Sequence, residues 1–421
     1  MNMTKLSDTP RVAYVISGFP ITFLVNEVEA HRQAGWKILP LSSSAPIPPD
    51  SLSSLEKDWR EHTVYRPQVA TAFLDVVRTV VHNPVKTLRV LGWLMRLALA
   101  SPSECMKALY EIGAACHFAP ICRDFGVEHL HVHFASRSLS LGLMLGILLD
   151  LPVTCTAHAF DLYTRGARSL RFRLRQCPAI ATISEFNVRY LQDKCGEEIA
   201  RRCTVVRCGV DLDRFKGLDR RPVAGRLLCV TRLTPHKGLD VAIDACGLLR
   251  ERSVDFMFQI VGDGEMRAFL EQRVRHLDLS HHVTFLGALP NDRLRGVMAE
   301  ARAFVLPCVT LPNGDHDGLP VALMEAMASE IPTISTPISG IPELITNGVS
   351  GVLVPEKDPV ALADALQRLL LEPDLCHRLG QAGRQSVEEN FDAKKNAAKL
   401  REVFLNIHCQ SSNSSRSTSV S

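Results

Sequence analysis

Short apolar runs alternate with helical patterns along the first half of the chain. Residues 11–17 have the pattern of a buried strand and run into a glycine turn. A helical pattern then covers residues 26–34, and residues 36–41 form a second apolar run. Strand, turn, helix and strand in this order predict a βαβ unit and hence a parallel sheet. Further candidate strands, separated by helical stretches, are residues 129–134, 153–157, 179–183 and 204–207.

The same alternation restarts in the second half of the chain. Residues 217–225 are polar and rich in turn-forming residues, and a new strand pattern begins at 226–231. A stretch of this kind is typical of a linker between domains. Later candidate strands are residues 255–261, 282–286, 303–307, 332–336 and 351–354. The predicted fold class is therefore α/β, with two Rossmann-like domains facing a cleft and ligands at the carboxyl ends of the strands.

A helix-rich segment, residues 70–118, differs from the rest of the first half. It carries Arg78, Lys86, Arg89, Arg96 and Lys107, and the stretch 85–100 is basic and apolar with a tryptophan, Trp93. Two interpretations stay open. The segment is either an interfacial amphipathic helix that contacts a membrane, or a helical pair that packs on the domain with a solvated basic face.

Composition excludes several classes of protein. The 421 residues hold 48 Lys and Arg against 45 Asp and Glu and are 46% hydrophobic, which excludes wholesale disorder and a nucleic-acid binder driven by bulk charge. The 13 cysteines include no Cys-x-x-Cys pair, so we expect reduced, mostly buried thiols and no structural zinc. The first ten residues lack a signal-peptide core, and the apolar run 139–149 is shorter than the roughly 20 residues of a membrane span. We therefore expect a cytoplasmic protein.

Two loops that follow predicted strands carry residues suited to an anionic ligand. Arg232 and Lys237 lie five residues apart before a predicted helix, an arrangement that can hold a diphosphate. The second loop contains Gly262 and Gly264, which allow a ligand to approach the backbone closely.

A third loop contains Asp317, Gly318 and Leu319 and opens a helix at 321–329. Pro320 is suited to the first turn of that helix, so the preceding amides are expected near its positive end. Glu325 follows Asp317 by eight residues, and the two carboxylates can accept from ribose and sugar hydroxyls. Each loop alone fits an ordinary helix cap or ion pair, but their combination on successive strand ends indicates a ligand site.

These residues resemble a known family. The stretches Arg232-Leu-Thr-x-x-Lys237-Gly238, Asp317-Gly-Leu-Pro-Val-Ala-Leu-Met-Glu325 and Pro332-Thr-Ile-Ser-Thr-Pro-x-Ser-Gly340-Ile-Pro-Glu343 look like the family 4 glycosyltransferases, which are retaining enzymes of the GT-B fold. The first half resembles their colanic-acid and exopolysaccharide subgroup through Phe23-x-x-Asn26-Glu27, His131-x-His133-Phe134, Thr156-Ala-His158-Ala-Phe-Asp161 and Ser184-Glu-x-Asn187. The resemblance runs from about residue 11 to about residue 405.

The resemblance implies how the second half binds a donor. Arg232 and Lys237 would bind the donor's diphosphate and stabilise its leaving charge, and Glu325 would hold the ribose. Asp317 stands where the family has the first acid of its two-acid motif and would contact the donor sugar, assisted by the amides of Gly318 and Leu319.

Three further positions complete the implied site. His158 would lie near the reacting carbon and contact the transferred sugar. Gly264 would approach the nucleotide, and Gly18, in the turn after the first strand, belongs to the donor-binding set. The implied organisation is an acceptor domain over residues 1–220, a donor domain over 221–392, a helix over 393–409 that crosses back to the first domain, and a disordered Ser-rich tail over 410–421.

The implied chemistry needs neither metal nor cofactor. Cleavage of the donor builds an oxocarbenium-like centre and leaves negative charge on the diphosphate, which an Arg/Lys pair stabilises. The acceptor attacks from the same face, and the leaving phosphate takes its proton. His129, His131 and His133 share one strand face, but no acid or cysteine is evident near them, so we interpret them as packing residues. The acidic pair in Asp211-Leu212-Asp213 is expected to end the first domain rather than bind metal.

Three functions remain under consideration. The leading one is a glycosyltransferase that uses a nucleotide-sugar donor and a glycan or lipid-linked acceptor, cytoplasmic or peripheral at an anionic inner membrane, with no nucleic-acid partner. The family's Ser-Glu-Thr after Phe-Pro is absent between Phe19 and Phe23, where the acceptor would bind. That difference motivates an alternative, a catalytically weakened sugar-nucleotide-binding partner of an assembly complex. The third is a GT-B sugar-nucleotide epimerase.

Overall fold

The chain divides into two compact units. The computed structural model describes residues 7, 9–49, 52–164, 166–289 and 291–417. One unit comprises Met1–Arg207 with Lys394–Ser421, and the other is Cys208–Ala393. The division falls before the 220/221 boundary expected from the sequence. The peptide N–H of Val210 donates to Phe391 and that of Ala393 donates to Val210, and these bonds tie the connecting segment to the second unit.

The first unit is built on a parallel sheet. Its described residues form seven strands in the order β3-β2-β1-β4-β5-β6-β7. The apolar runs predict six of these strands and their parallel direction, but not their order. The strand β3 was not predicted, because its two residues are too few to show an apolar pattern. The strands are β1 (Arg11–Ile16), β2 (Lys37–Ser42), β3 (Val64–Tyr65), β4 (His129–His133), β5 (Val153–Ala157), β6 (Ile180–Thr182) and β7 (Cys203–Val205).

Helices cover both faces of this sheet, because alternate strand residues point to opposite sides. In β1, Ala13 and Val15 enter one core, whereas Val12, Tyr14 and Ile16 enter the other. The helices are α1 (Thr22–Gln33), α2 (Ser54–Glu61), α3 (Val69–His82), α4 (Pro84–Ala100), α5 (Pro102–Leu109), α6 (Ile112–Phe125), α7 (Arg137–Leu149), α8 (Phe160–Tyr163), α9 (Ala167–Leu174), α10 (Glu185–Cys195), α11 (Glu197–Ala200) and α19 (Ala393–Ser417).

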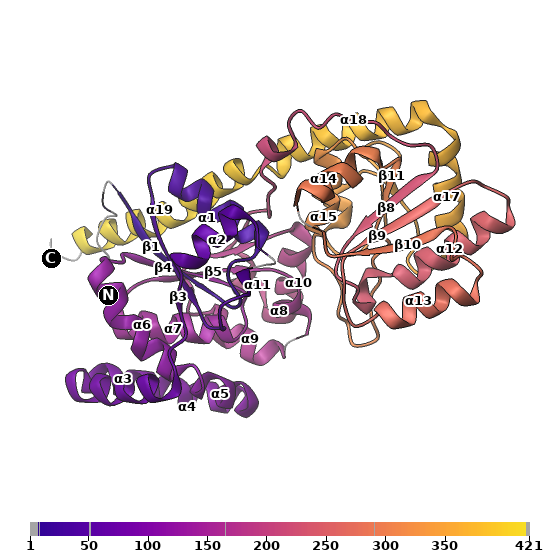
Figure 1. Cartoon of the computed structure of the whole chain (residues 1–421). Helices are drawn as coiled ribbons and strands as arrows, with labels where there is room; N and C mark the ends of the chain where they lie inside the picture. The colour runs from indigo at the N-terminus through magenta and orange to yellow at the C-terminus, as the bar shows by residue number, and fades with distance from the viewer. Residues whose placement is uncertain (1–6, 8, 50–51, 165, 290, 418–421) are drawn as a thin grey trace. The chain divides into compact units, whose positions relative to one another are not determined.

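The last helix, α19, packs on the first unit. Leu400 and Phe404 are buried in the same core as Val12 and Tyr14, and Arg401 donates to the Ala30 carbonyl of α1. Figure 1 shows α19 in yellow alongside α1. The helix extends to Ser417, beyond residue 409, where the sequence-based expectation ended it. Residues 418–421 lie outside the described residues.

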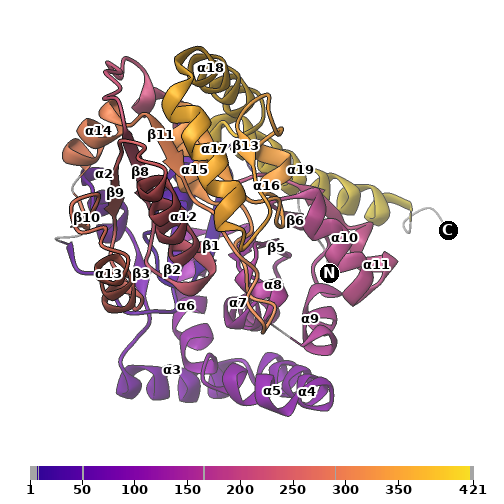
Figure 2. The ribbon, with the colours of Figure 1, turned by 90° about the vertical axis from the view of Figure 1, so that its right-hand side faces the viewer.

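Helices α3, α4 and α5 form an outer layer beyond α6 and α7 (Figures 1 and 2). The inner side of α4 belongs to the core, where Trp93 is 5% exposed and donates from Nε1 to Oε1 of Gln176 at 2.6 Å. The tryptophan is therefore a packing residue rather than a membrane anchor. The outward side is neither polar nor mainly basic, because it exposes many apolar side chains: Val69, Phe73, Leu74, Val77, Val80, Val81, Val85, Leu88, Leu91, Met95, Leu99, Met106, Leu109 and Tyr110.

The second unit repeats the α/β plan. Its described strands form a six-stranded parallel sheet in the order β10-β9-β8-β11-β12-β13. They are β8 (Arg226–Val230), β9 (Met257–Val261), β10 (Val283–Gly287), β11 (Ala303–Val305), β12 (Thr333–Ser335) and β13 (Val352–Leu353). The helices are η2 (Leu212–Phe215), η3 (Pro235–Lys237), α12 (Leu239–Glu251), α13 (Arg267–His276), α14 (Asn291–Glu300), α15 (Val321–Ala328), α16 (Ile341–Leu344), α17 (Pro359–Leu371) and α18 (Pro373–Asn390).

Two further features bear on expectations from the sequence: the Asp211-Leu212-Asp213 motif and the length of the apolar helices. Asp211 accepts from the peptide N–H of Asp213 at 3.1 Å and caps η2, which lies in the second unit rather than at the end of the first. Across the described part of the chain, no helix is both long and apolar enough to cross a membrane.

Candidate active site

Three loops of the second unit meet at one edge of its sheet. Arg232 and Lys237 follow β8, Gly264 follows β9, and Asp317 lies in the long segment after β11. These strands are neighbours in the order β9-β8-β11 and run parallel, so their carboxyl ends lie side by side. The three loops that the sequence places after strands therefore lie together at one edge of this sheet.

Close backbone contacts hold these loops together. Gly238 has a φ of +65°, and a Cβ there would lie 2.0 Å from the Pro307 carbonyl oxygen. Val309 donates its peptide N–H to the His236 carbonyl at 3.0 Å. A Cβ on Gly264 would lie 2.5 Å from the Leu233 carbonyl oxygen. Both glycines are therefore required by close approach between neighbouring loops.

Lys237 and Asp317 form the charged centre of this arrangement. Nζ of Lys237 donates to Oδ2 of Asp317, and the two side chains are only 16% and 17% exposed. Burial alone would lower the pKa of Lys237, but the Asp317 carboxylate outweighs it and the pKa is raised. Burial would raise the pKa of Asp317, and the lysine reverses that as well, so that pKa is lowered. Both groups are therefore charged at neutral pH.

Arg232 is the free cation beside this pair. It is exposed and forms no hydrogen bond or ion pair with any residue that the structure describes. His236 lies close enough to Arg232, Lys237 and Asp317 to experience all three charges; burial lowers its pKa and Lys237 lowers it further. One guanidinium is thus available to an anion next to a neutralised Lys/Asp pair.

The segment before α15 carries the remaining predicted donor residues. Gly318 and Leu319 are buried, and the Gly318 carbonyl accepts from the peptide N–H of Gly340 at 3.1 Å. Pro320 immediately precedes the helix, with an extended ψ of 116°, so the prediction that it occupies the first turn is wrong by one position. Glu325 is half-buried in the second turn of α15, on the same segment as Asp317.

His158 and Gly18 belong to the first unit, whereas the other predicted site residues belong to the second. Gly18 lies in the turn after β1 with a φ of +77°. His158 follows β5, and its peptide N–H donates to Oδ1 of Asp161 at 3.1 Å. The other oxygen of Asp161 accepts from the peptide N–H of Ala135 at 2.6 Å, which clamps the ends of β4 and β5 together.

A buried hydrogen-bonded chain leads away from His158. Its Nε2 lies 3.1 Å from Nδ1 of His133, and Nε2 of His133 lies 3.1 Å from Oε1 of Glu27. Because an ionised carboxylate only accepts, His133 carries its proton on Nε2 and accepts at Nδ1. His158 therefore donates from Nε2. Burial, with a smaller contribution from His133, lowers the pKa of His158 to about 3, so its imidazole is neutral.

Glu27 corrects one expectation about the histidine face of β4. We expected no acid near these histidines, but ligand atoms of Glu27, His131 and His133 lie within 4.8 Å of one another, a grouping that can hold a metal ion. Both ring nitrogens of His131 already contact hydroxyls, Thr154 at 2.8 Å and Thr156 at 2.9 Å. A metal would have to displace these bonds, so the group is better described as a hydrogen-bonded chain.

Glu27, Asp161 and Asn187 belong to motifs that resemble the family, but the sequence predicted no role for them. Asn187 accepts from Tyr163 and donates to the His158 carbonyl. The signal for Glu27 was its spacing on α1: Glu27 and His31 are four residues apart and so lie on the face that meets β4.

Comparison with known proteins identifies the family. A family model described as "Glycosyltransferase Family 4" matches residues 61–214, and one described as "Glycosyl transferases group 1" matches residues 218–386. A Salmonella typhimurium relative, WcaL, is provisionally named as a colanic acid biosynthesis glycosyltransferase. It is 37% identical over 292 residues, which cover 67% of this chain and 70% of that protein. The chain belongs to glycosyltransferase family 4.

Another relative is the amylovoran biosynthesis glycosyltransferase AmsK of Erwinia amylovora. It is 39% identical over 207 residues, 49% of this chain and 51% of that protein, so the chain spans about half the length of this relative. Among solved structures, Anabaena Alr3699/HepE in complex with UDP-glucose matches with a TM-score of 0.68 and 15% identity, over 94% of this chain and 99% of that one. This likeness confirms the expected GT-B fold.

Proposed function

We propose that the chain is a retaining glycosyltransferase of exopolysaccharide biosynthesis. It moves a sugar from a nucleotide-diphosphate donor to a glycan or lipid-linked acceptor. The observation that carries this proposal is the unpaired Arg232 beside the Lys237–Asp317 ion pair at the carboxyl ends of β8 and β11. A diphosphate is the ligand that such a site fits, since it needs cations held close together, and Arg232 and Lys237 lie on one loop after β8.

The proposed mechanism follows from charge. As the bond between sugar and phosphate breaks, negative charge grows on the diphosphate, and Arg232 and Lys237 stabilise it more strongly than they stabilise the intact donor. Asp317 and Glu325 accept from sugar and ribose hydroxyls, and His158 contacts the transferred sugar. The acceptor attacks from the face that the phosphate leaves, and the phosphate takes its proton.

Two side chains supply the positive charge, and we therefore propose that transfer requires neither a metal ion nor a cofactor. Transfer should then survive chelation of divalent cations. Support for the donor class comes from Anabaena Alr3699/HepE, whose structure contains UDP-glucose. Support for the pathway comes from AmsK, which is named for amylovoran biosynthesis.

We also propose that the chain works at the surface of an anionic membrane. The outward side of α3–α5 supports this proposal, because a run of exposed apolar side chains of this length is typical of a surface that contacts lipid or another protein. Val69 is 88% exposed and Leu99 is 85% exposed.

The test of the transferase proposal is Arg232→Ala, assayed for transfer to lipid and glycan extracts. Transfer should fall about 10²–10³-fold with an unchanged unfolding transition. Arg378→Ala is the matched control, since Arg378 is also exposed and forms no bond with the described residues. Near wild-type turnover in Arg232→Ala would overturn the proposal. In the wild-type protein, donor binding without transfer would favour a non-catalytic partner. Conversion of the donor by the wild-type protein without an acceptor would favour an epimerase.

A further inference from the structure

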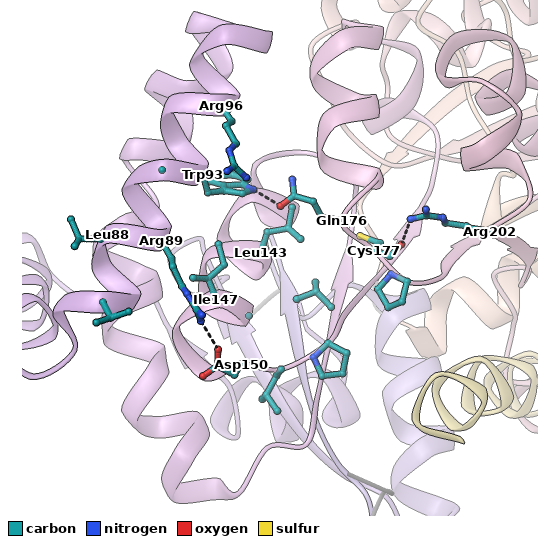
Figure 3. Close-up of a pocket in the computed structure, with 17 residues that line it drawn as sticks. Leu88, Arg89, Trp93, Arg96, Leu143, Ile147, Asp150, Gln176, Cys177 and Arg202 are labelled. Carbon is teal, nitrogen blue, oxygen red and sulfur yellow. Dashed lines mark hydrogen bonds and ion pairs between the residues drawn. The ribbon is translucent and has the colours of Figure 1, made fainter. Parts of the chain in front are cut away.

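A cavity of about 880 Å³ lies in the first unit between α4 and the edge of the sheet (Figure 3). Its volume is in the range of sites that enclose small organic ligands, roughly 300–1,000 Å³. Figure 3 shows Arg89, Trp93 and Arg96 along α4, with Gln176, Cys177 and Arg202 across from them. Most of the wall is apolar: Val85, Leu88, Trp93, Leu143, Ile147 and Val153.

This cavity is separate from the candidate active site. Pro152 and Arg202 line it and immediately precede β5 and β7, and Pro178, which also lines it, lies two residues before β6. His158 instead follows the carboxyl end of β5. At ~3.3 Å per residue, the length of that strand places the two about 16 Å apart along the sheet. The cavity therefore has no place in the transfer chemistry described above.

The cavity borders the exposed apolar side of α3–α5. Val85 and Leu88 line it and are 66% and 68% exposed, so the apolar outer surface continues into the cavity. Surface and cavity together offer a continuous apolar path, as a membrane-embedded hydrocarbon chain requires.

The exposed charges on α3–α5 have one sign. Acidic side chains within residues 69–112 are buried and paired: Asp75 with His117 at 2.8 Å, Glu104 with Arg173 at 3.1 Å, and Glu111 with Arg66 at 3.2 Å. The exposed charges of α3–α5 are therefore cationic.

The cavity itself also carries an excess of positive charge. Asp150 is held by both Lys86, at 2.7 Å, and Arg89, at 3.3 Å. Arg96 is exposed, lines the cavity and forms no hydrogen bond or ion pair with the residues that the structure describes. Its guanidinium is available to a phosphate.

We propose that this cavity binds one molecule of an anionic phospholipid, with an acyl chain between α4 and the sheet and the phosphate at Arg96. The lipid would hold the α3–α5 layer at the bilayer surface. The apolar lining, its continuity with an exposed apolar surface and the unpaired arginine carry the proposal. It rests on the membrane contact proposed above and not on the transfer reaction.

Gly92 allows a direct test. It lines the cavity on α4, and a Cβ there would meet no atom within 4 Å, so Gly92→Leu fills the cavity without a backbone clash. Gly296→Leu is the matched control on α14, because that helical glycine is equally open. For the charge, Arg96→Gln is compared with Arg378→Gln.

The measurement is quenching of Trp93 fluorescence by brominated acyl chains in vesicles. We expect vesicles that contain brominated phosphatidylglycerol to quench the fluorescence of the wild-type protein, and vesicles that contain brominated phosphatidylcholine to quench it less. The quenching should be lost in Trp93→Phe. Gly92→Leu should remove most of it, and Arg96→Gln should weaken binding of the anionic vesicles about fivefold, as expected for one cation at an anionic surface. Both control variants should behave as wild type.

Several results would overturn the proposal. Two of them are undiminished quenching in Gly92→Leu and equal quenching by both lipids. A third is stronger displacement of the brominated lipid by polyprenyl phosphate than by phosphatidylglycerol. A fourth is a wild-type protein that sediments as a dimer and becomes a monomer only in Gly92→Leu. The thermal shift given by UDP-sugars is recorded in the same variants. A retained shift with no lipid binding would exclude the lipid site while leaving the transferase proposal standing.

Discussion

The Lys237 ammonium pairs with the Asp317 carboxylate between the loop after β8 and the segment after β11. Lys237 is one of the two cations that the family resemblance assigns to the donor's diphosphate, and its charge is cancelled by Asp317. Arg232 alone is then fully available in the ligand-free site. Under the proposed function, a diphosphate that engages Lys237 would compete with Asp317, and donor binding would be coupled through this one bond to the position of Asp317.

The first prediction concerns the stability of this pair. Lys237→Met leaves a largely buried carboxylate without a counter-charge and should lower the free energy of unfolding by about 1–3 kcal/mol. Asp317→Asn should cost less, since the lysine side chain can reach solvent. The double variant should recover much of the loss, because both charges are then gone. Urea unfolding of the four proteins gives the coupling; a loss in the double variant equal to the sum of the two single losses would show that there is none.

The second prediction concerns the loop after β9. Gly264→Ala places a methyl group 2.5 Å from the Leu233 carbonyl oxygen, so the two loops must separate. We expect a loss of stability of about 1–3 kcal/mol and weaker donor binding. Gly296→Ala meets nothing within 4 Å and lies in a helix, where it should stabilise by about 0.5–1 kcal/mol. Calorimetry with and without a UDP-sugar measures both; unchanged donor affinity in Gly264→Ala would separate the loop from the donor site.

The fold was largely predictable because its strands are buried on both faces. A parallel strand covered by helices is an uninterrupted apolar run, as residues 12–16 illustrate, and the run predicted at residues 11–17 covers β1. Composition fails where packing decides. The basic residues and Trp93 of α4 did not reveal which side chains face outward: the tryptophan faces inward, and aliphatic side chains are exposed together with Arg89 and Arg96.

The candidate site was predictable in position but not in its contacts. Sequence order places Arg232, Lys237 and Asp317 at strand ends, and parallel topology brings those ends together. No pattern along the chain reveals that Lys237 pairs with Asp317, since the two are 80 residues apart. The same holds for Glu27 and His133, whose contact joins a helix to a strand 106 residues later.

The third prediction is a pH dependence of stability that comes from buried histidines. Burial lowers the pKa of His31 to about 4, with Arg401 and His133 adding to burial and Glu27 opposing it. The pKa of His158 is lowered to about 3. Unfolded histidine titrates near 6.5, so between about pH 6.5 and pH 4 the unfolded chain binds protons that the folded chain does not. The contribution of these histidines to the free energy of unfolding is therefore fully present above that window. Within the window the free energy of unfolding falls as the pH decreases, by up to about 1.4 kcal/mol per pH unit for each histidine.

Urea unfolding at pH 7, 6 and 5 checks the sign. His31→Gln should flatten the slope, whereas His281→Gln, an exposed histidine outside the cluster, should leave it unchanged. The lowered carboxyl pKa values of Glu27 and Asp317 act below this window, because their contribution is lost only as the pH falls through the folded-state values. A stability that rises between pH 7 and pH 5 would contradict the prediction.

The last prediction concerns Glu27 as a positioning residue for His158. The carboxylate forces His133 to donate from Nε2, and His158 consequently donates from Nε2 and keeps Nδ1 free of a proton. In Glu27→Gln the new amide can donate to His133, which reverses the direction of both hydrogen bonds and moves the proton of His158 to Nδ1. We expect kcat to fall about tenfold or more while the KM for the donor changes little, because the residues proposed to bind the diphosphate lie in the other unit. Nitrogen-15 NMR of the imidazoles reports the tautomer directly, a readout that a purely structural role would not move. Glu29→Gln is the control, since that side chain accepts from Trp59 and lies outside the chain of histidines. An unchanged His158 tautomer in Glu27→Gln would contradict the prediction.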